Sequence, residues 1–199
     1  MKRASIFLGI LFLAAAGFTQ GYQVGDVAGD FRLKNVDGKY VSMSDYPDAK
    51  GFIVIFSCNH CPYVVAYEDR MIALHQEYAA KGFPVIAINA NDPEVQPQDS
   101  YELMQERARE KGFPFPYVFD EGQKVLPLYG ATRTPHVFLL ERVGDELKVA
   151  YIGAIDDNYQ DASQVKEKYL ANAIEALIKG KRPEPDFTRA IGCTIKKKS

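Results

Sequence analysis

The sequence predicts an α/β fold with a mixed central β-sheet and helices on both faces. Two continuous apolar segments, 52–56 and 85–88, are typical of central strands that are buried on both faces. Each is followed by a segment whose apolar residues have helical spacing. Two further apolar strands, 137–140 and 149–152, come late in the chain. Strands that alternate with helices and end in a strand pair favour a mixed sheet.

A β-hairpin is expected to open the domain. A tight turn at 36–39 separates short strands at 31–33 and 40–43. After strand 52–56, a helix begins near Pro62 and ends at Gly82. Its apolar residues, at spacings of three and four, are Val64, Tyr67, Met71, Leu74 and Tyr78. This helix is predicted to pack one face against the sheet.

The second half of the chain continues the alternation. Asp99 or Ser100 is predicted to cap a helix that ends at Gly112. A strand at 116–119, a short helix at 123–129 and the late strand pair follow. The last helix is expected from about 163 to 179, with Gly180 as its stop.

Composition indicates one globular domain behind a targeting segment. The chain has 199 residues, 47% of them hydrophobic, and its net charge of −2 argues against a general nucleic-acid binder. Residues 1–20 carry two basic residues, an apolar run and then small residues, as in a signal peptide cleaved near 17–21. An uncleaved N-terminal anchor is the alternative. We expect a domain at 21–180, a tail at 181–199, no stable membrane insertion after cleavage, and a periplasmic or secreted protein.

A C-x-x-C motif, Cys58-Asn59-His60-Cys61, lies between the strand at 52–56 and the following helix. The N–H groups and dipole of a helix start favour thiolate over thiol, and only the thiolate attacks a disulfide. Cys58 is therefore expected to attack and Cys61 to resolve the mixed disulfide. His60 is expected to stabilise the Cys58 thiolate; the alternative is an exposed polar residue with no role.

Other interpretations of the three cysteines have less support from the sequence. A structural zinc site wants four ligands in close pairs, and Cys193 is remote in sequence. A purely structural disulfide is disfavoured by the short C-x-x-C spacing at a helix start. Cys193 itself is expected to be a packed thiol, because free cysteine behaves as a small apolar group. A tail thiol that relays oxidation with the pair and an intermolecular link are the alternatives.

With these pieces in place, the chain resembles the thioredoxin superfamily, and most closely its peroxiredoxin-like redoxin branch of AhpC/TSA type. The resemblance covers about residues 25–180. Its specific pieces are Val27-Ala28-Gly29-Asp30-Phe31 with Leu33, Asp37-Gly38-Lys39, the C-x-x-C after a strand, and Gly130-Ala131-Thr132-Arg133-Thr134-Pro135 before a strand. It implies a thioredoxin-like fold in which a cis Thr134-Pro135 loop faces the cysteines and Thr134 binds the partner's backbone. The alternative is a trans proline at a strand entrance.

The chain departs from its resemblance in two ways. Phe52 stands where thioredoxins carry a buried carboxylate, so proton transfer from Cys61 must use water, His60 or another residue. Peroxiredoxins have a threonine three residues before the peroxidatic cysteine, and this chain has Ile55 before Cys58. Arg133 lies near the loop where they carry a thiolate-stabilising arginine.

The function expected from these features is an exported thiol-disulfide oxidoreductase. Its partners would be protein disulfides or dithiols and a redox partner, with Cys58, Cys61 and His60 as catalytic residues, Thr134 and Pro135 as substrate-binding residues, and no cofactor or metal. A thiol peroxidase is the alternative from the same fold, and it is supported by the redoxin-like N-terminal hairpin and by Arg133. A copper(I) carrier or assembly protein that uses Cys58, Cys61, His60 and His136 is the alternative of another class.

Overall fold

The computed structural model describes residues 21–198. The expected signal segment at 1–20 lies outside the described residues, and the domain boundaries stay predictions. Within the described part, no helix combines the length and the apolar character that crossing a bilayer requires.

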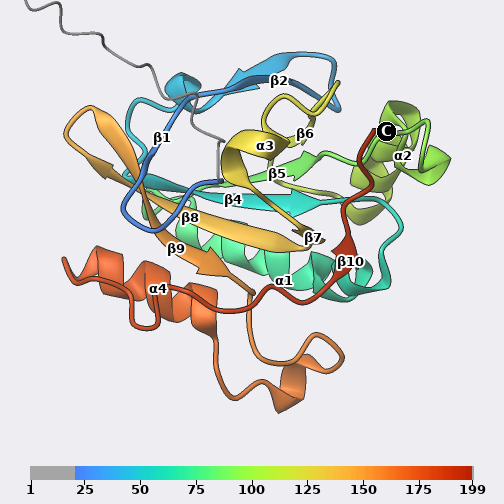
Figure 1. Cartoon of the computed structure of the whole chain (residues 1–199). Helices are drawn as coiled ribbons and strands as arrows, with labels where there is room; N and C mark the ends of the chain where they lie inside the picture. The colour runs from blue at the N-terminus through green and yellow to red at the C-terminus, as the bar shows by residue number, and fades with distance from the viewer. Residues whose placement is uncertain (1–20, 199) are drawn as a thin grey trace, which may run out of the picture.

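An eight-stranded mixed sheet forms the centre of the molecule, in the order β1-β9-β8-β4-β5-β6-β2-β3 (Figure 1). Its strands are β1 (Val27–Ala28), β2 (Arg32–Asn35), β3 (Tyr40–Ser42), β4 (Gly51–Ser57), β5 (Val85–Asn89), β6 (Tyr117–Phe119), β8 (His136–Val143) and β9 (Glu146–Gly153). β5 runs parallel to both β4 and β6, and the remaining pairs are antiparallel. A separate two-stranded ladder joins β7 (Arg133–Thr134) to β10 (Cys193–Thr194).

Helices cover both faces of this sheet, as expected. They are α1 (Pro62–Tyr78), α2 (Tyr101–Lys111), α3 (Leu126–Tyr129) and α4 (Tyr169–Ile178), with 3-10 turns η1 (Met43–Asp45), η2 (Pro97–Asp99) and η3 (Ala162–Gln164). Successive side chains of β4 point to opposite faces. Phe52 and Phe56 join the core that contains α3 and the hairpin, whereas Ile53 and Ile55 join the core beneath α1, α2 and α4. The mixed sheet and the N-terminal hairpin are confirmed.

The end of α1 and two helix starts differ from the prediction. α1 ends at Tyr78 rather than at Gly82, because residues 79–82 form a turn. The last helix begins at Tyr169 rather than near 163, because the Asp161 side chain accepts the N–H of Ser163 and closes a 3-10 turn instead. The short helix begins at Leu126 rather than 123, because the Asp120 carboxylate accepts the N–H groups of residues 124–126 and orders the approach to it. At both helix starts a local side-chain bond competes with helical hydrogen bonds.

A buried ion pair holds α1 against α2, and so joins the two segments that carry the site. Glu68 on α1 is fully buried. Its carboxylate accepts two hydrogen bonds from Arg107 on α2, each 2.6 Å, and lies 3.3 Å from Nζ of Lys111. Removal of one partner from a buried pair leaves the other charge without compensation.

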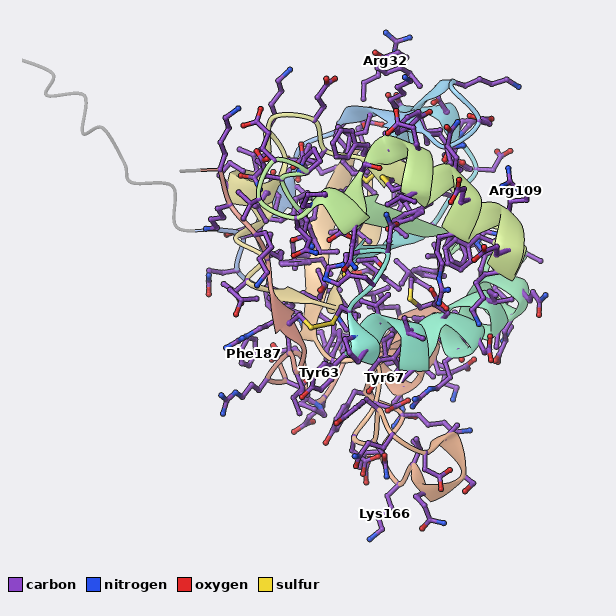
Figure 2. All side chains as sticks on the ribbon, turned by 90° about the vertical axis from the view of Figure 1, so that its right-hand side faces the viewer. Arg32, Tyr63, Tyr67, Arg109, Lys166 and Phe187 are labelled. Carbon is purple, nitrogen blue, oxygen red and sulfur yellow. A yellow bond between two sulfur atoms is a disulfide. The ribbon has the colours of Figure 1, made fainter. Side chains whose placement is uncertain are left out.

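We expect Arg107→Met to lower the free energy of unfolding by about 2 to 4 kcal/mol, because Glu68 keeps only Lys111 as a counter-charge. Urea unfolding at neutral pH measures this loss. Arg109→Met is the matched control, since Arg109 lies exposed on the same helix (Figure 2) and its removal makes the same change in net charge. Equal losses in the two variants would show that the buried pair contributes nothing specific.

Candidate active site

The two cysteines lie where β4 ends and α1 begins. β4 is buried along its whole length and ends at Ser57, and Cys61 is the N-cap of α1, with Pro62 in its first turn. Cys58 is 2% exposed and Cys61 is fully buried. Figure 2 shows a disulfide at this end of α1, beside Tyr63. The predicted strand, motif and helix are therefore in the predicted order.

Thr134 contacts both sulfur atoms of the motif. The Thr134-Pro135 peptide bond is cis, as predicted. The Thr134 hydroxyl lies 3.4 Å from Sγ of Cys58, and its carbonyl oxygen lies 3.3 Å from Sγ of Cys61. Thr134 is 1% exposed, so these contacts form in a water-poor environment.

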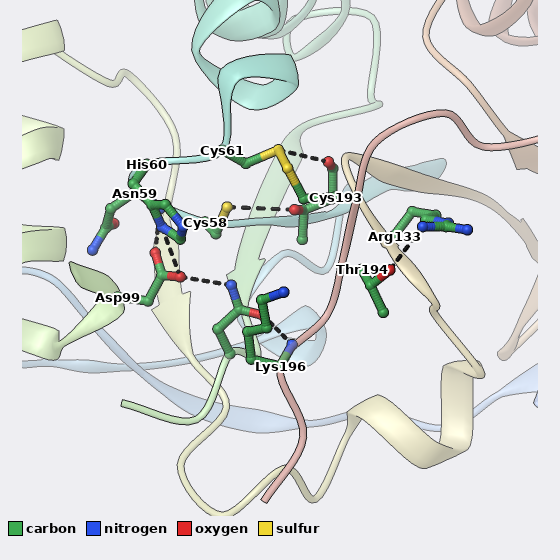
Figure 3. Close-up of a disulfide and its surroundings, with 11 residues drawn as sticks. Cys58, Asn59, His60, Cys61, Asp99, Arg133, Cys193, Thr194 and Lys196 are labelled. Atoms are coloured by element: carbon green, nitrogen blue, oxygen red, sulfur yellow. Dashed lines mark hydrogen bonds and ion pairs between the residues drawn. A yellow bond between two sulfur atoms is a disulfide. The ribbon is translucent and has the colours of Figure 1, made fainter. Parts of the chain in front are cut away.

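Cys193 is not a packed free thiol, and this expectation was wrong. Cys61 forms a disulfide with Cys193, across 132 residues of sequence, and Cys58 is left as a free thiol (Figure 3). The pair forms because β10 lays the tail against β7, in a register that places Cys193 opposite Thr134. A two-residue strand in a polar tail gives little sequence signal, so this pairing could not be predicted from spacing.

Cys58 is a protonated thiol in this state, contrary to the expected thiolate. Burial, and secondly the negative charge of Asp99, raise its pKa to about 11. The hydroxyl of Thr134 and the backbone N–H groups of Cys61 and His60 lower the pKa, but by less. The helix start therefore acts in the predicted direction, and the loss of water outweighs it.

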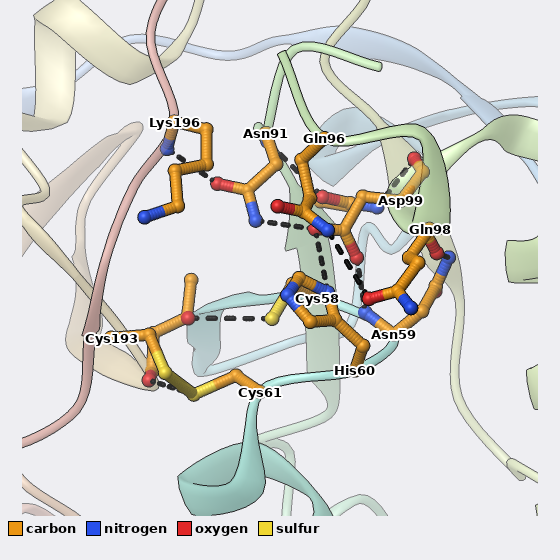
Figure 4. A network of polar contacts seen from close by, with 12 residues as sticks. Cys58, Asn59, His60, Cys61, Asn91, Gln96, Gln98, Asp99, Cys193 and Lys196 are labelled. Atoms are coloured by element: carbon orange, nitrogen blue, oxygen red, sulfur yellow. Dashed lines mark hydrogen bonds and ion pairs between the residues drawn. A yellow bond between two sulfur atoms is a disulfide. The ribbon is translucent and has the colours of Figure 1, made fainter.

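Asp99 is the residue that the sequence analysis missed at this site. Its side chain is fully buried, and it comes from η2, just before α2. The carboxylate accepts the backbone N–H of Asn59 at 2.7 Å and the side-chain amide of Asn91 at 2.6 Å (Figure 4). Ser100, the other predicted cap, is the residue that caps α2, through the N–H of Leu103. Asp99 thus supplies a buried carboxylate from an element other than the strand that carries Phe52.

His60 lies between Asp99 and solvent. Its Nδ1 is 3.1 Å from Oδ2 of Asp99, and about a third of the side chain, 31%, is exposed. Cys58, His60 and Asp99 each offer one ligand atom within 4.8 Å of the others. This set differs from the predicted copper ligands, because Cys61 is bound to Cys193 and Nδ1 of His136 accepts the N–H of Thr132. Copper carriage stays an untested alternative.

Arg133 points away from Cys58. Its guanidinium donates a 2.7 Å hydrogen bond to the hydroxyl of Thr194 in the tail (Figure 3). In this state it therefore orders the tail rather than a thiolate. The peroxidase alternative loses one of its two sequence arguments in this arrangement and stays an untested prediction.

His136 is a packed strand residue, as expected, and it gives the fold a pH dependence. It begins β8, it is 8% exposed, and burial lowers its pKa to about 4, below the usual 6.5. The folded state therefore resists a proton that the unfolded chain accepts. Stability from this group is complete above pH 6.5 and declines as the pH falls from 6.5 toward 4.

We expect His136→Asn to flatten the loss of stability on acidification. Between about pH 7 and about pH 4.5 the wild type should lose about 2 to 3 kcal/mol more than the variant, because the variant has no imidazole to protonate on unfolding. Asparagine keeps an acceptor for the N–H of Thr132. Urea unfolding of both proteins at the two pH values measures the difference, and parallel losses would contradict the assignment.

We expect Asp99→Asn to lower the pKa of Cys58, because the charge that disfavours the thiolate is removed. The pKa should stay above the ordinary value of 9.0, since burial is the larger cause. Cys58 is the free cysteine of the disulfide-bonded form, so its rate of alkylation against pH reports this pKa directly. Asp92→Asn is the matched control, because Asp92 is also buried but does not act on Cys58. An unchanged pKa in Asp99→Asn, or an equal fall in both variants, would contradict the role of Asp99.

Comparison with known proteins finds relatives in sequence and in structure. A thiol-disulfide oxidoreductase ResA from Halalkalibacterium halodurans is 27% identical over 161 residues, which are 74% of this chain and 87% of that protein. The crystal structure of an uncharacterized conserved protein from Geobacillus kaustophilus superposes with a TM-score of 0.81 at 35% identity, over 96% of this chain and 98% of that one. A hypothetical protein from Sinorhizobium meliloti 1021 superposes with a TM-score of 0.82 at 31% identity, over 90% and 97% of the two chains.

The family model of AhpC/TSA proteins matches residues 24–152. That range contains the hairpin, both cysteines of the motif, Asp99 and the Thr134-Pro135 loop. It confirms the resemblance drawn from the sequence, and the chain belongs to the AhpC/TSA family.

Proposed function

We propose that this protein is a thiol-disulfide oxidoreductase that exchanges disulfides with protein partners through Cys58 and Cys61. The observation that carries the proposal is the position of both sulfurs at a helix start, against one residue, Thr134, of the facing loop. Curated relatives of the chain are named thiol-disulfide oxidoreductases, which supports the same activity.

The exchange needs a reduced pair. The Cys58 thiolate attacks a partner disulfide, so that one partner sulfur leaves as a thiolate and Cys58 forms a mixed disulfide. Cys61 then attacks Cys58 Sγ, the partner leaves with both sulfurs reduced, and Cys58 and Cys61 are oxidised to a disulfide. Cys61 cannot take this part while it is bound to Cys193, so the observed bond must open before the pair turns over.

Two polar side chains, Asp99 and His60, lie next to Cys58. Asp99 is buried and already accepts hydrogen bonds, whereas His60 connects the site to solvent. The His60 ring lies beside Asp99 and reaches solvent, and one ligand atom of each of Cys58, His60 and Asp99 lies within 4.8 Å of the others, so the proposed path of the Cys58 proton to water runs along this side of the site. In this proposal Asp99 and His60 take the place of the buried carboxylate that thioredoxins carry at the position of Phe52.

The partners and compartment follow from the chemistry and the first 20 residues. Protein disulfides or dithiols are the substrates, and a second redox protein resets the pair. Export of the chain by the segment at 1–20 would place these thiols where disulfides persist. We therefore assign the protein to the periplasm or the secreted fraction, a placement that fractionation of cells producing the full chain would check.

We expect Cys58→Ser to abolish reduction of insulin disulfides by the full chain with dithiothreitol as reductant, because the proposed exchange starts with attack by Cys58. Cys61→Ser, reduced and then freed of dithiothreitol before insulin is added, should instead accumulate a mixed disulfide with the substrate, visible as a covalent adduct on a non-reducing gel. Unchanged thermal unfolding of each variant would show that the loss is chemical. Turnover retained by Cys58→Ser would defeat the proposed function.

A further inference from the structure

The tail occupies the strand edge where a partner peptide was expected. β10 pairs antiparallel with β7, with Cys193 opposite Thr134 and Thr194 opposite Arg133. An extended peptide that adds a strand to a free edge is a common mode of peptide recognition. Here the added strand comes from the same chain, and it carries a cysteine to the active site.

Contacts after Cys193 hold the tail in place. Ile195 is 4% exposed and packs into the core beside α3, and its N–H donates to the carbonyl of Thr132 at 3.3 Å. The N–H of Lys196 donates to the Asn91 side chain at 2.7 Å, and its carbonyl accepts from Gln123 at 2.8 Å. The tail is therefore bound by specific contacts along its length, as a substrate peptide would be.

Gly192 allows the close approach that brings Cys193 to the site. A Cβ at this position would overlap the carbonyl oxygen of Thr134, which belongs to the backbone and cannot move freely. Any larger residue would push the tail away from β7. The absence of a side chain at Gly192 thus allows Cys193 to pair with Thr134. A substitution at position 192 is expected to displace the tail while all three cysteines are kept.

We infer that the tail is an internal substrate, and that Cys193 is a third redox cysteine, which takes the disulfide over from Cys58. This inference rests on the proposed function, because the Cys58–Cys61 disulfide is its starting point. The Cys193 thiolate attacks Sγ of Cys61. The Cys61–Cys193 bond forms, the Cys58–Cys61 bond breaks, and Cys58 leaves as a thiolate that takes up the proton given up by Cys193. Oxidation state is conserved, so the step needs no external oxidant or reductant.

The described state matches the product of this step. Cys61 and Cys193 are joined, and Cys58 lies buried as a free thiol whose raised pKa favours uptake of the proton. Cys193 is half-buried whereas Cys58 is 2% exposed. A reductant therefore reaches the Cys61–Cys193 disulfide, at Cys193, more easily than it would reach a Cys58–Cys61 disulfide. Transfer of the disulfide to the tail therefore separates the sulfur that attacks the substrate from the sulfur that accepts electrons.

The test follows which pair of cysteines is oxidised. The fully reduced chain is oxidised with one equivalent of diamide, quenched in acid at successive times, alkylated and mapped by peptide mass spectrometry. We expect Cys58–Cys61 to form first and then to be replaced by Cys61–Cys193 as the dominant disulfide. Cys193→Ser should stop at Cys58–Cys61.

Gly192→Val keeps all three cysteines but unseats the tail, so its dominant disulfide should shift to Cys58–Cys61. Ala190→Val is the matched control, because it adds a branched side chain two residues earlier in the tail, and it should behave as the wild type. The relay is overturned if the wild type ends as Cys58–Cys61, or if Gly192→Val forms as much Cys61–Cys193 as the control.

This outcome is separate from that of the proposed function. If insulin is reduced in a Cys58-dependent way but oxidation ends at Cys58–Cys61, the relay fails and the oxidoreductase stands. If Cys58→Ser still reduces insulin, the proposed function fails, and the mapping of disulfides still reports on the tail.

Discussion

The antiparallel pairing of β4 with β8 is the constraint on which the site depends. Phe56 lies opposite His136 in this ladder. The same register, continued by two residues beyond the ends of the strands, places Cys58 opposite Thr134, where their side chains meet at 3.4 Å. The middle of the ladder, residues 52–56 and 137–140, consists of buried apolar residues, so a slip of one residue would exchange the side chains that face the two cores. Packing of the core thus sets the distance between Cys58 and the Thr134-Pro135 loop.

Two opposing electrostatic effects meet at Cys58. The start of α1 supplies N–H groups that favour a thiolate, while burial and the Asp99 carboxylate favour the thiol. With the tail in place, burial and the Asp99 carboxylate have the larger effect, and the pKa of Cys58 is raised. Asn59 and Asn91 each donate a hydrogen bond to the Asp99 carboxylate, which places its charge close to the sulfur. Because a thiol reacts more slowly than a thiolate, we expect low reactivity of Cys58 in this state.

The tail links the chemistry of the cysteines to access. It pairs with β7 through backbone bonds, and its Ile195 completes the core next to α3. The same strand edge is needed by any peptide that approaches Thr134 in an extended form. In the described state, covalent attachment at Cys61 and occupation of this edge therefore occur together, and the bound tail covers the backbone of Thr134.

The sequence by itself determined the elements that local pattern encodes. Apolar runs identified β4 and β5, helical spacing identified α1, and the order of C-x-x-C and Thr134-Pro135 identified the family and the loop that faces the cysteines. These features were predictable because each depends on residues close together in the chain. The helix starts near 126 and 169 were less predictable, since side-chain bonds of Asp120 and Asp161 compete with the helix there.

Only the tertiary structure decided the partner of Cys61, the state of Cys58 and the role of Asp99. Cys193 reaches Cys61 through a two-residue strand whose register depends on Gly192 and on contacts with Asn91 and Gln123. Asp99 reads as a helix cap in sequence, and it becomes a site residue because η2 folds it beneath Asn59. The pKa of a thiol depends on how much water and charge surround it, and those are properties of the packed molecule rather than of a motif.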